Sequence, residues 1–435
     1  MPSLTPPSKN WRTFIIVWSG QMASTVGSYM TRFALTIWLW NLSEQATPIA
    51  LLAFFTEIPA ILASPLGGAI ADRFSRKTLI ILGDTVAGLS TVMIFLLYLG
   101  GNLEIWHLYL IGAFNGAFTR LQKLAYTASI TMLIPQQDYT RASGLGSVLH
   151  YGSVVIAPAV AGALYPIVGL RGILGIDLVT FIIAIATVLF VTIPNPSSAS
   201  KKQDPSSSSM GKEIKFGFSY LLNRPGLLSL IFLATVFQFS HDIGKALYSP
   251  MILARSGNDT QVLGFVSAAA GIGGILGSIM VSVWRIPGRK IDLVLLSMIG
   301  AGLSKIVFGL GQTLFLWFPA QFLSSIHFPI MASARQAIVL TNVQADVQGR
   351  VLAISSAFVG VASPLAKLIA GPLADQVFVP AMQEGGILNG VFGGVFGAGN
   401  GSGFALLYTL SSLGLVCIGI AGYSFSNLKT IDTDA

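Results

Sequence analysis

Charged side chains inside long apolar stretches are the residues through which this sequence could do chemistry. A charge at the centre of a lipid bilayer costs at least ~2.5–3.5 kcal/mol on insertion scales, so each such residue is a functional candidate. Basic side chains can hold an anionic group, and a carboxylate can exchange a proton when its surroundings change. The basic candidates are Arg32, Arg120, Lys123, Lys245, Lys305, Arg335 and Lys367, and the acidic ones are Glu57, Asp84, Asp177, Asp242 and Asp375.

The elements that carry these charges are twelve apolar segments. Of the 435 residues, 53% are hydrophobic and 10% charged, whereas soluble domains carry about 25% charged residues. A spanning helix needs roughly 20 mainly apolar residues. The segments are 12–40, 47–69, 77–99, 105–132, 142–166, 170–193, 226–253, 262–284, 290–311, 314–341, 350–379 and 403–426. Their continuous runs differ from the alternating pattern of barrel strands, so we expect an all-α, polytopic membrane protein.

Basic residues outside the segments predict the topology. Lys and Arg collect in cytoplasmic loops, and with both termini inside, only Arg171 and Arg255 fall on outer loops. The net charge of +8 follows from this asymmetry, so no nucleic-acid partner is needed. Cys417 is the only cysteine, which excludes an internal disulfide and a cysteine metal site. The first apolar run is too long for a signal peptide.

A polar tract divides the chain into two halves. Residues 194–212 are rich in Ser and Pro, which cannot bury apolar surface. We therefore predict a six-helix bundle over 1–193, a cytoplasmic linker with a short amphipathic helix over 194–224, and a second six-helix bundle over 225–435. The two halves show a sequence repeat, since Arg76-Lys77 follows the second segment and Arg289-Lys290 follows the eighth.

The turn after the second segment carries the most specific motif. It reads Gly68-Ala-Ile-Ala-Asp72-Arg73-Phe-Ser-Arg76-Lys77 and resembles the Gly-x-Leu-Ala-Asp-Arg-x-Gly-Arg-Lys signature of the major facilitator superfamily, apart from Ile70 and Ser75. The resemblance implies twelve transmembrane helices in two six-helix pseudo-repeats, with substrate bound between the halves near mid-membrane.

Three further patches extend this resemblance over the chain. In the fifth segment, Pro158 and Gly162 are similar to a Gly/Pro-rich antiporter motif. Gly349-Arg350, together with a Pro- and Gly-rich run from Pro364, is similar to the macrolide-efflux and enterobactin-exporter branch of the drug:proton antiporters.

The motif has a physical interpretation as a gate. Gly67 and Gly68 would let two helix ends approach closely, and Asp72 would face the positive N-terminal end of the eleventh segment, near Gly349 and Arg350. We assign gating to these residues and to the remaining gate candidates: Arg73, Arg76, Lys77, Pro158 and Gly162. The alternative is an ordinary basic inner loop.

The resemblance also implies that segments one, four, seven and ten line the central cavity. On these segments we predict the substrate-binding residues, namely Gln21, Arg32, Arg120, Lys123, Gln238, Lys245, Gln321 and Arg335. Arg120 and Lys123 share one helical face, which favours an anionic cargo. The alternatives are that the pair binds Glu57 or reaches the membrane surface.

Glu57 and Asp242, both near mid-span, are the predicted proton-coupling residues, although Asp242 and Lys245 also have the spacing of a local ion pair. We interpret Asp84 and Asp177 as hydrogen-bond anchors between helices. Lys305 and Lys367 lie nearer the outer ends, where we expect their ammonium groups to reach water.

These patterns predict a secondary transporter of the plasma (inner) membrane rather than an enzyme. We expect a monomer that exports an amphipathic, and on the charge pattern anionic, small molecule such as a siderophore, peptide or macrolide. The proton gradient drives it and no cofactor is needed. One alternative is an uptake permease for an organic anion. Another is a membrane sensor or assembly protein that does not transport.

Overall fold

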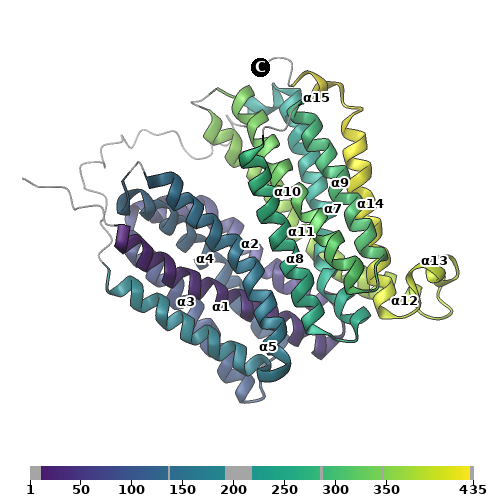
Figure 1. Cartoon of the computed structure of the whole chain (residues 1–435), viewed down its shortest axis with the longest axis horizontal. Coiled ribbons are helices and arrows are strands. Elements are labelled where there is room, and N and C mark those ends of the chain that lie inside the picture. Colours follow the sequence, from purple (N-terminus) through teal and green to yellow (C-terminus); the bar gives the residue numbers. More distant parts are fainter. Residues whose placement is uncertain (1–10, 136–137, 192–217, 285–287, 345–346, 432–435) are drawn as a thin grey trace, which may run out of the picture. The chain divides into compact units, whose positions relative to one another are not determined.

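The computed structural model describes residues 11–135, 138–191, 218–284, 288–344 and 347–431, without the side chains of 65–73 and of a few single positions. Within these ranges the regular structure is helical. The elements, labelled in Figure 1, are α1 (Trp11–Ser43), α2 (Ala46–Arg73), α3 (Arg76–Leu99), α4 (Ile105–Leu133), α5 (Tyr139–Leu189), α7 (Pro225–Ser256), α8 (Thr260–Val283), α9 (Lys290–Leu310), α10 (Leu314–Asn342), α11 (Gln348–Leu373), η3 (Ala374–Phe378), α12 (Val379–Met382), α13 (Asn389–Phe396), α14 (Asn400–Gly422) and α15 (Ser426–Thr430).

Each of the twelve predicted segments overlaps a helix. Among the described residues, nine helical stretches are long and apolar enough to cross a membrane. One of them contains two predicted segments, because α5 is broken at Gly169, where φ is 61° and glycine is favoured. The two remaining predicted segments correspond to α1 and α4, which have 33 and 29 residues. The prediction of a polytopic, all-helical membrane fold is confirmed.

The chain forms two compact units. One comprises Met1–Trp38 and Phe55–Pro205, and the other comprises Leu39–Phe54 and Ser206–Ala435. The end of α1 and the start of α2 therefore pack with the helices of the second half of the sequence. The predicted boundaries at 193 and 225 stay a prediction about the sequence halves.

In the first unit, α3 joins the other helices. Leu79 and Ile80 of α3 are buried against Val17 of α1, Ala125 of α4 and Val188 of α5. A Cβ on Gly116 of α4 would lie well inside contact distance of a backbone oxygen of α2, so these two helices touch backbone to backbone.

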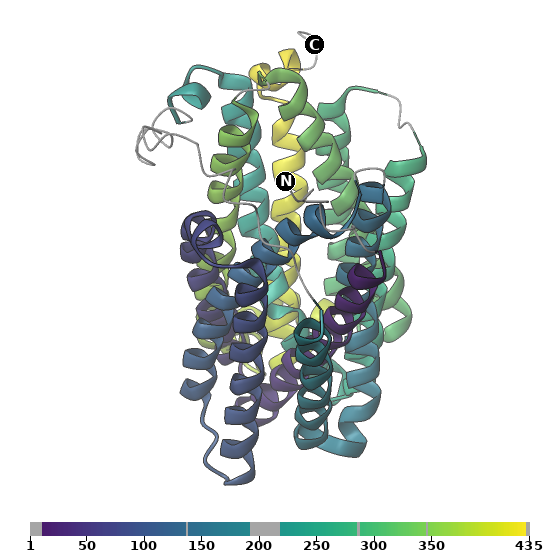
Figure 2. The same ribbon diagram turned by 90° about the vertical axis from the view of Figure 1, so that its left-hand side faces the viewer.

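In the second unit, α7, α9, α10, α11 and α14 share one apolar core, and Figures 1 and 2 show their long rods side by side. Large side chains such as Phe237 and Met298 fill it. α8 packs closely on α10, because a Cβ on Gly273 or Gly277 would come within 2.4 Å of an α10 carbonyl oxygen. This bundle positions the charged residues described next.

Candidate functional site

Asp242 lies at the centre of a polar cluster in the second unit. It stands on α7 and is fully buried, at 0% exposure. Gln238, one turn earlier, donates from Nε2 to Asp242 Oδ2 at 2.6 Å. The other carboxylate oxygen, Oδ1, has no hydrogen-bond partner among the described residues. The helix thus brings together two predicted site residues and leaves one buried acceptor available to a proton or ligand.

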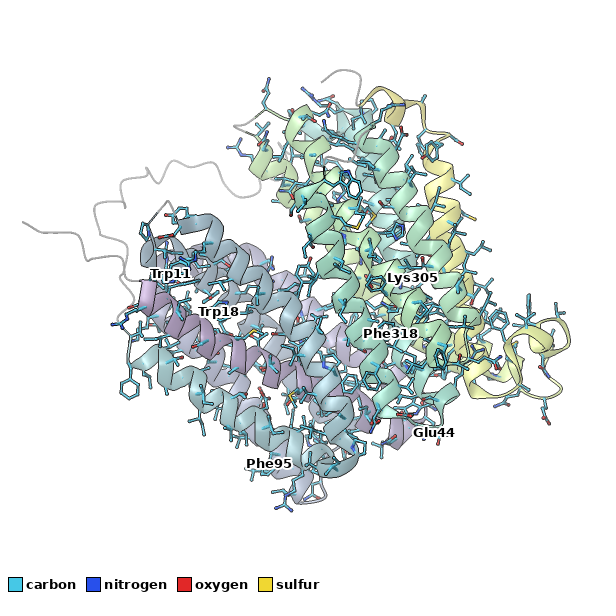
Figure 3. All side chains as sticks on the ribbon, in the orientation of Figure 1. Trp11, Trp18, Glu44, Phe95, Lys305 and Phe318 are labelled. Carbon is cyan, nitrogen blue, oxygen red and sulfur yellow. The ribbon has the colours of Figure 1, made fainter. Side chains whose placement is uncertain are left out.

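Two buried lysines complete the cluster. Lys305 of α9, labelled in Figure 3, is 5% exposed and donates from Nζ to the Tyr408 hydroxyl of α14 at 3.2 Å. Lys367 of α11 is 3% exposed and donates to Ser363 Oγ at 3.1 Å. The expectation that both ammonium groups reach water is wrong, because both side chains point into the bundle.

Cations outnumber carboxylates in this cluster. The positive charges of Lys245 and Lys367 act on Asp242, and Lys305 interacts electrostatically with Lys245 and Asp242. Lys245 is exposed, so it offers its charge at the edge of the cluster. His241 packs its ring on Phe328 of α10, with Nδ1 buried and lacking a hydrogen-bond partner among the described residues. The cluster can therefore hold an anionic group or exchange a proton at Asp242.

The two predicted substrate-binding residues on α10, Gln321 and Arg335, differ in burial. Gln321 is 9% exposed and donates to Ser325 Oγ at 3.2 Å, while its Oε1 is buried without a partner in the described structure. Arg335 is half-buried further along the helix. No hydrogen bond described here links either residue to Asp242.

In the first unit, the predicted residue Gln21 is engaged by a carboxylate. Gln21 of α1 donates to Asp84 Oδ2 of α3 at 2.9 Å, and Gln122 of α4 donates to Asp84 Oδ1 at 2.6 Å. Gln122 also approaches Gln21 Oε1 at 3.2 Å. Asp84 is 2% exposed. Its role as an anchor between helices is confirmed.

Asp177 forms a second anchor with hydroxyl groups. Thr31 of α1 and Thr91 of α3 each donate to Asp177 Oδ2 at 2.9 Å. Ser28 approaches Oδ1 at 3.5 Å. The carboxylate, on the second half of α5, thereby ties three helices together.

The predicted cations of the first unit are exposed side chains. Arg32 lies over the Tyr29 ring, 5.6 Å from its centroid. Arg120 donates from Nε to Ser64 Oγ at 2.7 Å, a neutral partner. Lys123 is near enough for its charge to act on His150 of α5. Glu57, the other predicted coupling residue, is half-buried on α2.

The gate residues are only partly described. Gly67, Gly68, Asp72 and Arg73 belong to the end of α2, whose side chains lie outside the described residues. Lys77 donates to the backbone oxygens of Leu189 and Val191, at 3.1 and 2.7 Å, beside the end of α5.

The other gate residues occupy different environments. Arg76 is half-buried in the first turn of α3. Pro158 and Gly162 are buried in the first half of α5. Gly349 and Arg350 are exposed in the first turn of α11. The gating role of all these residues stays a prediction.

A cavity of about 480 Å³ lies in the second unit, and Asp242 is not among its lining residues. Its lining includes Trp40, Glu44, Arg255 and Asn258, with the glycine-rich stretch 397–401. The Arg255 guanidinium already donates to the carbonyl oxygens of Gly309, Gly311 and Phe396. Because that cation is occupied, we place the candidate site at the Asp242 cluster.

The sequence did not predict that Lys305, Lys367 and Tyr408 belong to the cluster around Asp242. Each stands on a different helix, and only the packing of α7, α9, α11 and α14 brings them to one place. The available signal was the presence of two lysines at membrane depth with no acid one helical turn away.

Comparison with known proteins places these features in a family. The family model described as "Transmembrane secretion effector" matches residues 3–395. Macrolide efflux protein A of Streptococcus pyogenes is 23% identical over 376 residues, covering 85% of this chain and 91% of that protein. The enterobactin exporter EntS of Escherichia coli O1:K1 / APEC is 23% identical over 303 residues, covering 69% and 71%.

A solved structure supports the fold. A bacterial homolog of the human lysosomal transporter Spinster, in an inward-facing and unoccupied conformation, superposes with a TM-score of 0.69 and 16% identity, covering 98% of both chains. The relatives and the fold are those of transporters rather than enzymes.

Proposed function

Because the chain belongs to the transmembrane secretion effector family of the major facilitator superfamily, we propose that it exports an amphipathic small molecule in exchange for protons. Two relatives carry names that describe efflux, of macrolides and of enterobactin. The single observation that carries the coupling is Asp242, a fully buried carboxylate with one unpartnered oxygen among several cations.

Alternating access gives this carboxylate its role. Such transporters expose a mid-membrane site to one side and then to the other. A buried carboxylate binds a proton more readily when it is dry, and less readily when cations face it. Opening the site first to one side of the membrane and then to the other would change the hydration and the electrostatic surroundings of Asp242, so the proton would bind on one side and leave on the other.

The charge of the cargo decides the direction of coupling. A cationic cargo, or a neutral cargo that donates hydrogen bonds to the carboxylate, binds better when Asp242 is ionised, so cargo and proton compete and exchange across the membrane. An anionic cargo binds better when Asp242 is protonated, because the lysines then lack their counter-ion; cargo and proton would travel together. The excess of cations around Asp242 therefore favours a second candidate function, uptake of an organic anion with protons.

Uptake into proteoliposomes under pH gradients of opposite direction tests the proposal. Vesicles containing the purified protein receive a macrolide or enterobactin outside and an imposed pH gradient. Exchange predicts accumulation when the interior is acid, and loss of accumulation when a protonophore collapses the gradient. Accumulation only with an acid exterior would replace export by the uptake function. Accumulation that ignores the gradient would remove proton coupling.

The location in the membrane is also part of the proposal. We place the protein in the plasma membrane with both termini in the cytoplasm, because basic residues concentrate on that side. Tags at each terminus should resist protease added to intact cells and be cleaved after the cells are permeabilised. Cleavage in intact cells would reverse the topology.

A further inference from the structure

A carboxylate in η3, directly after α11, caps the beginning of α2. Asp375 Oδ1 accepts from the backbone N–H of Ala46 at 2.9 Å, and Oδ2 accepts from the backbone N–H of Thr47 at 2.8 Å. The Thr47 hydroxyl donates to Oδ2 as well. All three residues belong to the same compact unit. Asp375 thus binds two of the backbone donors that open α2.

The sequence around α2 explains why a distant cap is needed. The first four N–H groups of a helix lack partners within the helix, and Ser, Thr, Asp or Asn at the preceding position usually supplies one. Here Gln45 precedes the helix, and the first turn contains no acidic residue. Asp375, 329 positions from Ala46, supplies the acceptor instead. It stands in the π-helical turn Ala374–Phe378, an irregularity often found at functional sites.

Small residues bring the helices close enough for this cap. A Cβ on Gly371 of α11 would lie 2.6 Å from Thr47 Cα, so α11 and α2 meet backbone to backbone. Ala50 of α2, Ala246 of α7 and Ala370 of α11 form a buried apolar cluster beneath the cap. Contacts between small residues let helices pack tightly and still separate, because no long side chains interlock.

A hydrogen bond at the end of α1 is a second contact between the Leu39–Phe54 segment and the rest of the second unit. Trp40 Nε1 donates to Asn258 Oδ1 at 2.7 Å. Leu39–Phe54 thereby packs with the second unit, while the chain before and after it belongs to the first. This short segment is therefore a candidate for contacts that change during transport.

We propose that Asp375 is a positioning residue that holds the outer side of the transporter closed by capping α2, and that the cap detaches when the outer side opens. The outer side is the one opposite the cytoplasmic termini. The proposal rests on alternating access, the mechanism stated under the proposed function. It adds a specific contact, formed by Asp375 and permitted by Gly371, that must break once in each cycle.

Cysteine accessibility tests the cap without substrate or gradient. In a Cys417→Ser background, Ala50→Cys is exposed to a membrane-impermeant maleimide added outside intact cells. Asp375→Ala and Gly371→Ala should each raise the labelling rate at least threefold, and Asp375→Glu should bring it back toward the parent. Gly360→Ala is the matched control, because a Cβ at that position of α11 meets open space. Unchanged labelling in both variants would overturn the proposal.

Disulfide locking tests the same contact in a protein with an intact cap. Oxidation of Ala50→Cys with Ala370→Cys should stop transport, and reduction should restore it. The control pair is Ser240→Cys with Gly414→Cys, which joins α7 to α14 across a Cβ separation of 3.8 Å, suitable for a disulfide.

The control pair should transport in both redox states. Continued transport by the oxidised Ala50→Cys/Ala370→Cys protein would overturn the proposal. The labelling assay uses no proton gradient, so failure of proton coupling leaves its result unaffected and the two claims fail separately.

Discussion

Replacing Gln21 should act on the protein through Asp84. Both ends of the Gln21 amide are occupied in the structure, by Asp84 Oδ2 and by the Gln122 amide. These two hydrogen bonds hold the amide between α1, α3 and α4, so its removal acts first on the packing of these helices. We therefore expect Gln21→Ala to destabilise the first unit and to alter transport indirectly, and the prediction is tested by a double-mutant cycle with Asp84→Ala.

The burial of Gln21 and Asp84 determines the coupling free energy that we expect between the two substitutions. Hydrogen bonds to charged groups contribute about 1.5–3 kcal/mol in soluble proteins, but hydrogen bonds between membrane helices average about 0.6 kcal/mol and reach about 1.7. Gln21 and Asp84 are 7% and 2% exposed, and the acceptor is a carboxylate, so the upper part of the membrane range applies. A coupling of about 1–1.7 kcal/mol is a change of roughly 5- to 20-fold in the unfolding equilibrium.

Reversible unfolding in mixed detergent measures this coupling, and apparent substrate affinity is measured in parallel. Gln21→Ala should lower affinity no further once Asp84→Ala is present. Thr91→Ala is the control partner, because Thr91 binds Asp177 instead, and its effect should add to that of Gln21→Ala. Additive effects of Gln21→Ala and Asp84→Ala, or an affinity loss that persists in the Asp84→Ala background, would refute the reasoning.

Three further variants probe the anchors and the cluster. Asp177→Ala takes the acceptor from the Thr31 hydroxyl and leaves Thr91 only the Ala87 carbonyl oxygen at 3.2 Å, so it should destabilise the protein by about 1–3 kcal/mol, as measured by detergent unfolding; equal stability would argue against the anchor. Gly277→Ala places a Cβ 2.4 Å from the Ile326 carbonyl oxygen and should lower stability by about 1–3 kcal/mol, whereas Gly390→Ala, in open space, should not. Lys305→Met removes a buried cation but also takes the donor from the buried Tyr408 hydroxyl, two effects of opposite sign on stability, so thermal stability should change little while gradient-driven transport slows; unchanged transport would exclude Lys305 from the coupling cluster.

The sequence predicted the helices well because their signal is local. Each long apolar run must hydrogen-bond within itself in lipid, so composition alone indicates a helix. The break in α5 at Gly169 also fell where two predicted segments meet. The lengths of α1 and α2 followed from the same pattern.

The contacts between helices were less accessible to sequence reasoning. Lys305 and Lys367 were expected at the surface, because position along a helix was the available guide and the facing helix was unknown. The cap of α2 by Asp375 joins residues 329 positions apart, and no local motif marks it. Asp84 and Asp177 were interpreted correctly as anchors, since a carboxylate in an apolar helix needs donors from its neighbours.

The central claim is that Asp242 releases a proton when cargo binds. The most direct measurement adds a saturating macrolide or enterobactin to purified protein in weakly buffered detergent solution and follows a pH indicator. The account predicts proton release by the parent protein and by Glu57→Gln, and none by Asp242→Asn, which keeps the side-chain size. Proton uptake on binding, or release that persists in Asp242→Asn, would contradict it.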